Sequence, residues 1–133
     1  MNHQLKINIS LDENKVPEKI TWEQEKELKE VKAFFIQTWD KEQKVTTSLN
    51  LWTKAMTTDE MKMLFHQSLV SMVESLERAV PDEAEIIKDL YATCNYFAEK
   101  MKLISEEEVE RLIQKAKAEQ QLGHSDLDLK SLL

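Results

Sequence analysis

The residues best equipped for chemistry in this sequence are a single cysteine, Cys94, and three histidines, His3, His66 and His124. A cysteine thiol beside a histidine imidazole is a common nucleophile–base pair, and facing helices could bring Cys94 and His66 together. A lone cysteine on an apolar helical stripe is nevertheless more typical of a small core residue. We therefore interpret Cys94 as part of the core and His66 as a polar residue on the shoulder of its helix.

The sequence also lacks the patterns that hold metals and phosphates. Zinc sites need closely spaced pairs of His or Cys, whereas the three histidines lie far apart. Phosphate-binding loops need several glycines for close backbone approach, and the chain has one, Gly123. The acidic cluster 106–108 is typical of a helix start, where carboxylates meet the positive end of the helix dipole. We expect no catalytic residues, no cofactor and no metal.

The composition indicates a small acidic protein. A chain of 133 residues is long enough for one domain with a core. The net charge of -7, spread along the length, opposes binding to nucleic acids or anionic lipids. A single cysteine forms no intramolecular disulfide and fits a reducing compartment. Because no apolar leader or membrane-spanning stretch is present, we expect a cytoplasmic protein without direct membrane insertion.

The elements that position these residues fall into two halves. The N-terminal half carries the alternation of apolar and polar residues that is typical of antiparallel strands covered on one face. The charged segment 23–30 is either a helical turn or a connector, and the start of 31–39 could also be helical. Four strands are predicted, at residues 5–11, 20–22, 31–39 and 45–53.

The C-terminal half has helical periodicity. Thr57 and Glu60 form a capping box at the start of a first helix. Pro81 ends that helix and suits the first turn of a second, and Ser105 with Glu108 opens a third. The second helix carries a core stripe that includes Cys94. The first helix carries a broad stripe that we expect to be buried, formed by Met61, Leu64, Phe65, Leu69, Met72, Val73, Leu76 and Val80.

Together these elements predict an α+β fold. An antiparallel sheet of about four strands in the N-terminal half is packed on one face by two or three C-terminal helices. We expect residues 1–103 to form the α+β domain, and residues 104–133 to be a helical extension followed by a flexible tail. Which face of the sheet is open is left undecided by the pattern.

The tryptophans and a second helical stripe are the candidates for a binding surface. We expect Trp22 and Trp39 to fill the core, since large aromatic side chains are mostly buried. Trp52 shares a strand face with polar residues, so on an open sheet face it would be exposed and suited to anchor a partner. Met63 and Val70 lie opposite the main stripe of the first helix; we favour burial under another helix, and a protein-binding stripe is the alternative.

Several short segments give the chain a resemblance to a known family. The matching segments are residues 12–18 with Ile20 and Trp22, 39–40, 51–54, 59–61, 65–67, 69–72, 77–79 and 96–100. Among them, the Leu-Trp-Thr-Lys and Phe-His-Gln segments together are fairly specific. Occurring in this order, the segments resemble the gliding-motility-associated protein GldC family of Bacteroidetes bacteria. The resemblance runs from about the first strand to Leu103, and residues 104–133 are an addition to the family pattern.

The resemblance implies an accessory protein of gliding motility, a process driven by an envelope machine coupled to type IX secretion. It implies no catalytic residues, so we expect contacts with protein partners among the components of the gliding or secretion machinery. The alternative function is a small acidic chaperone or adaptor for secretion substrates that acts as a homodimer. Family-pattern residues expected at the surface, together with the second stripe, give the predicted partner-binding set: Trp52, Lys54, Met63, His66, Gln67 and Val70.

Overall fold

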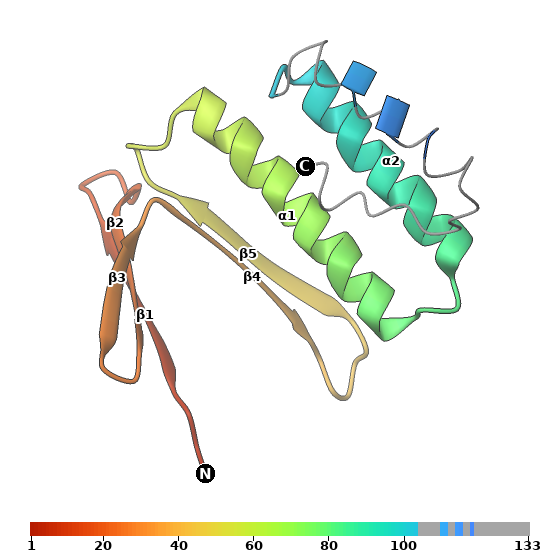
Figure 1. Ribbon diagram of the computed structural model, residues 1–133. Coiled ribbons are helices and arrows are strands. Elements are labelled where there is room, and N and C mark those ends of the chain that lie inside the picture. The colour runs from red at the N-terminus through yellow and green to blue at the C-terminus, as the bar shows by residue number, and fades with distance from the viewer. Residues whose placement is uncertain (104–109, 112–113, 116–117, 119–133) are drawn as a thin grey trace. The chain divides into compact units, whose positions relative to one another are not determined.

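The computed structural model describes residues 1–103, 110–111, 114–115 and 118 (Figure 1). The chain divides into two compact units, Met1–Thr58 and Asp59–Leu133. Within residues 1–103 the strands β1 to β5 precede the helices α1 and α2, whose bounds are given below. The predicted α+β class, with strands before helices, is confirmed. The capping box and apolar stripe predicted for a third helix fall on residues outside the described part of the chain.

Three strands form an antiparallel sheet in the order β1-β2-β3. They are β1 (Leu5–Leu11), β2 (Pro17–Gln24) and β3 (Glu27–Val31). Opposite Ile9 of β1 lies Ile20 of β2, which is completely buried and is the largest fully buried side chain among the described residues. The alternation that predicts the first two strands is therefore matched by their pairing.

Strand β3 is absent from the sequence-based prediction, which leaves residues 23–30 undecided between a helical turn and a connector. The chain instead reverses between Gln24 and Glu27, with Glu25 in the left-handed backbone region at a φ of 55°. Charged residues dominate β3, and its one leucine, Leu28, is 63% exposed. A strand with so little burial carries no apolar period, so the pattern could not reveal it.

The remaining strands, β4 (Ala33–Trp39) and β5 (Thr46–Trp52), form a separate two-stranded antiparallel sheet. Both strands are predicted, and the helical alternative for the start of 31–39 is wrong. Asp40 shapes the connecting loop, since its backbone N–H donates to the Val45 carbonyl at 2.9 Å and its carboxylate accepts the Glu42 N–H at 3.0 Å. The strands thus form two sheets, where the sequence predicts one.

After the strands, the residues described up to 103 form the helices α1 (Thr58–Ala79) and α2 (Ala84–Lys100), which lie side by side in Figure 1. Helix α1 begins directly after Thr57, as the predicted capping box requires. Pro81 lies in the connection and not in the first turn of α2, so that detail of the prediction is wrong. The packed centre of the pair consists of Val73, Ile87, Tyr91 and Cys94, with Val70 and Leu90 against them.

Helix α1 turns an unexpected face toward α2. The core uses Val70 and Val73, whereas Phe65 and Met72 of the predicted buried stripe are 43% and 54% exposed. Leu69, Leu76 and Val80 of that stripe are also exposed. The helix carries two apolar faces, and α2 covers the narrower one. Burial predicted from periodicity was right for Val73 and wrong for most of the broad stripe.

Candidate functional site

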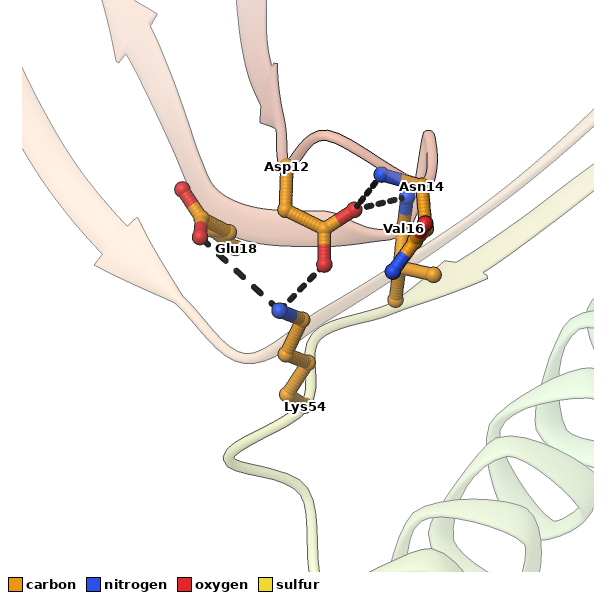
Figure 2. A network of polar contacts seen from close by, with 5 residues as sticks. All are labelled: Asp12, Asn14, Val16, Glu18 and Lys54. Atoms are coloured by element: carbon orange, nitrogen blue, oxygen red, sulfur yellow. Dashed lines mark hydrogen bonds and ion pairs between the residues drawn. The ribbon is translucent and has the colours of Figure 1, made fainter.

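Two segments that carry the family resemblance, 12–18 and 51–54, meet in space around Asp12 (Figure 2). One carboxylate oxygen of Asp12 accepts hydrogen bonds from the backbone N–H groups of Asn14, at 2.8 Å, and Val16, at 2.9 Å. The other oxygen forms an ion pair with the ammonium group of Lys54, which also lies 3.9 Å from a carboxylate oxygen of Glu18. Asp12 therefore shapes the turn from β1 to β2 and holds Lys54, two residues beyond the end of β5.

The charges of this cluster are tuned by these contacts. The hydrogen bond with Lys54, reinforced by the N–H of Val16, lowers the pKa of the Asp12 carboxyl, and the hydrogen bond with Asp12 raises the pKa of the Lys54 ammonium. Both groups therefore stay ionised over a wider pH range than isolated side chains would. The Asp12 side chain is only 10% exposed, whereas that of Lys54 is 53% exposed. Lys54 is thus partly at the surface, as predicted, but it already has an intramolecular partner.

Thr53 anchors the same segment to the backbone. Its N–H and its hydroxyl both donate to the carbonyl of Lys32, at 2.8 and 3.0 Å, where the chain passes from β3 to β4. The next N–H, of Lys54, donates to the Pro17 carbonyl at the start of β2, at 3.3 Å. Thr53 is 3% exposed. Sequence reasoning missed this role, because a threonine at the end of a strand gives no signal of a buried double contact.

Trp52, which precedes Thr53, lies on an aromatic face of the β4–β5 sheet whose two tryptophans are exposed. It is 48% exposed and pairs with Ala33 across the sheet. Residues directly opposite each other in a sheet share a face, so the same face carries Phe35, opposite Asn50, and Trp39, opposite Thr46. We call Phe35, Trp39 and Trp52 the aromatic face. Trp39 is 67% exposed, so its predicted place in the core is wrong, whereas Trp22 is partly buried.

His66 is not a surface residue. It is 9% exposed and stacks on Phe97 with ring centres 6.0 Å apart and planes at 16°. Burial lowers the pKa of the imidazole, and a hydrogen bond to the backbone of Cys94 opposes that shift less strongly. The Nε2 atom has no hydrogen-bond partner. The prediction that His66 is a surface residue is wrong, because the face of α1 that carries it is the one that packs on α2.

His66 and Cys94 also lack the features of an activated pair. The Nε2 atom forms no hydrogen bond with the thiol, and burial raises the pKa of Cys94, which favours the neutral thiol. A nucleophilic cysteine requires the opposite shift. Within the described residues, no group of three or more His, Cys, Asp or Glu side chains is arranged to hold a metal ion. Cys94 and His66 both contribute to the packing between α1 and α2.

The other predicted site residues of α1 divide between core and surface. Val70 packs against the α1–α2 core, so the favoured prediction of burial under another helix is confirmed for it. Met63 is 44% exposed, so the favoured prediction of burial is wrong for it, and Gln67 is exposed. Of the predicted set, the structure places Trp52 and Lys54 together at the end of β5, and Met63 and Gln67 on the surface of α1. His66 is buried, and Val70 is partly buried against the core between the two helices.

Comparison with known proteins identifies the family. The model of the gliding motility-associated protein GldC-like family matches residues 17–103. The chain belongs to the GldC-like family. The matched GldC-like region begins at the first residue of β2 and ends just beyond α2, so it includes the Thr53 anchor and both helices. Strand β1 and Asp12 precede it. No curated protein and no solved structure matches the chain. Among the described helices, none has the length and apolar character needed to cross a membrane.

Proposed function

We propose that the protein is a non-enzymatic accessory factor of bacterial gliding motility, coupled to the type IX secretion machinery. It acts in the cytoplasm by binding protein components of that machinery. Membership of the GldC-like family supports the association with gliding. The aromatic face of the β4–β5 sheet is the observation that carries the proposal of a binding role.

The aromatic face has the features of a protein-binding hot spot. Trp39 and Trp52 expose much of their indole surface, and the residues between them, such as Ser48 and Asn50, are polar and uncharged. Tryptophan is enriched among residues that dominate binding energy, because it buries a large area at a small cost in side-chain entropy. A hot-spot tryptophan contributes roughly 2 kcal/mol or more, which is about a thirtyfold change in affinity.

The test is affinity capture from the native organism followed by mass spectrometry. We expect Trp52→Ala to lose specific partners that the native protein retains. Leu28→Ala is the matched control, since Leu28 is an exposed apolar residue on the other sheet. Both variants should keep the native melting temperature. If Trp52→Ala and Trp39→Ala retain the full partner set, the aromatic face is not the binding surface.

A chaperone or adaptor for secretion substrates is the second candidate function. The exposed stripe of Phe65, Leu69, Met72 and Leu76 on α1 favours it, because holding unfolded chains requires exposed apolar surface. A chaperone would suppress aggregation of several unrelated unfolded substrates, whereas an accessory factor would capture a small, fixed set of folded partners. An aggregation assay on the native protein and on Met72→Lys separates the two.

A further inference from the structure

Strand β5 has one edge that pairs with nothing in the described part of the chain. Its seven residues, Thr46–Trp52, all pair with β4 on one side, and the sheet contains no third strand. Residues 46–50 are exposed without interruption. On such an edge, alternate residues direct unpaired N–H and C=O groups outward, which is a ready template for another strand.

This edge also lacks the protection that the other sheet has. Natural edge strands avoid pairing by means of charged residues, prolines and bulges. Strand β3 carries Glu27, Lys29 and Glu30, and β1 carries Lys6 and an irregular register between Ser10 and Leu11. Strand β5 consists of threonine, serine, leucine, asparagine and tryptophan, with no charge and no proline. In a chain with 32% charged residues, an uncharged exposed edge suggests that the edge is used.

We propose that β5 pairs antiparallel with β5 of a second copy of this chain, about a two-fold axis at Leu49. The product is a four-stranded sheet in the order β4-β5-β5-β4. In this register Leu49 lies opposite its own equivalent, Ser48 lies opposite Asn50, and Thr46 lies opposite Trp52. None of these pairs sets like charges against each other, so the strand is complementary to itself.

The pairing brings exposed side chains of the two copies together on each face of the sheet. Ile36 lies opposite Leu49 within one copy, so on that face an unbroken apolar row of Ile36, Leu49, Leu49 and Ile36 crosses the axis. On the other face, Trp52 meets Thr46 of the second copy, which is itself opposite Trp39. Adjacent strands are about 4.8 Å apart, so the two indole rings approach each other across one threonine. This arrangement occurs twice in the symmetric dimer.

The register is tested by disulfide formation at two neighbouring positions of the same face. Leu49→Cys places two thiols opposite each other, with Cα atoms about 4.5–5.5 Å apart, within the range that a disulfide spans. Thr47→Cys places its thiols four residues apart along the paired strands, about 13 Å, which no disulfide spans. The native chain is the blank, since Cys94 is 3% exposed. We expect mild oxidation to link Leu49→Cys at least tenfold faster than Thr47→Cys. Equal rates at both positions overturn the register.

The dimer itself is tested by light scattering with a charge pair. The native chain should have twice the monomer mass of 15.6 kDa. Ser48→Lys with Asn50→Lys puts like charges opposite each other and should give a monomer. Ser48→Lys with Asn50→Glu puts opposite charges in the same two places and should restore the dimer. A native monomer at tens of micromolar, or the same mass for both double variants, overturns the inference. The proposed role in gliding does not depend on this result, because its test is partner capture.

Discussion

Replacing Thr53 by valine tests whether the end of β5 is anchored as described. The change keeps the shape and the β-branched side chain and removes one hydroxyl, which donates to the Lys32 carbonyl at 3.0 Å. The carbonyl keeps a second donor, the Thr53 N–H at 2.8 Å, so no buried acceptor is left without a partner. The cost is therefore the net value of one hydrogen bond, about 1 kcal/mol, and not the larger penalty of an unsatisfied group.

Urea denaturation followed by circular dichroism measures this cost. With a typical slope of about 1–3 kcal/mol per molar urea, a loss of about 1 kcal/mol lowers the midpoint by roughly 0.3–1 M. Thr47→Val is the matched control, because it makes the same change at an exposed position of the same strand, where the effect should stay within about 0.5 kcal/mol. Equal losses for the two variants, or no loss for Thr53→Val, would refute the anchor.

Three further predictions concern the charged cluster and the helical unit. Asp12→Asn should reduce stability at neutral pH and make stability less sensitive to acid. Because the pKa of Asp12 is lowered in the folded state, its contribution to stability is present above pH 3.8 and is lost as the pH falls below that value. Urea titrations at several pH values measure this loss. His66 has a lowered folded pKa, so the helical unit should lose stability as the pH falls from about 6.5, and His66→Phe should abolish that slope in thermal melts. Ile87→Ala should cost about 2–5 kcal/mol in denaturant titrations, whereas Ile86→Ala, at the adjacent 48% exposed position, should cost less than about 1 kcal/mol; similar losses would contradict the assigned core.

Much of the fold follows from periodicity alone. Alternation identifies β1, β2, β4 and β5, and helical spacing identifies α1 and α2, because each of these elements has an apolar side that must be covered. Periodicity does not identify strand β3, since its charged residues leave it almost no apolar face. The division into two sheets could not be predicted either, because no glycine or proline marks the bend at Lys32.

The candidate site was harder to predict than the elements. The polar strand face around Trp52 predicts that it is exposed, whereas the general burial of large aromatic side chains places Trp39 in the core, where it does not lie. The sequence places His66 at the surface, because the pattern of a helix with two apolar faces does not indicate which face packs on its neighbour. The anchoring roles of Asp12 and Thr53 depend on contacts with distant backbone groups, and single-sequence patterns do not contain such contacts.

Tryptophan and cysteine are distributed so that each can report on the unfolding of a different unit of the unmodified chain. All three tryptophans lie within Met1–Thr58, and the only thiol, Cys94, lies buried in α2. Indole fluorescence therefore follows the loss of structure in the strands, whereas the rate of thiol alkylation follows the opening of the helices. Coincident transitions would mean that the two units unfold as one, and separate transitions would give each its own stability.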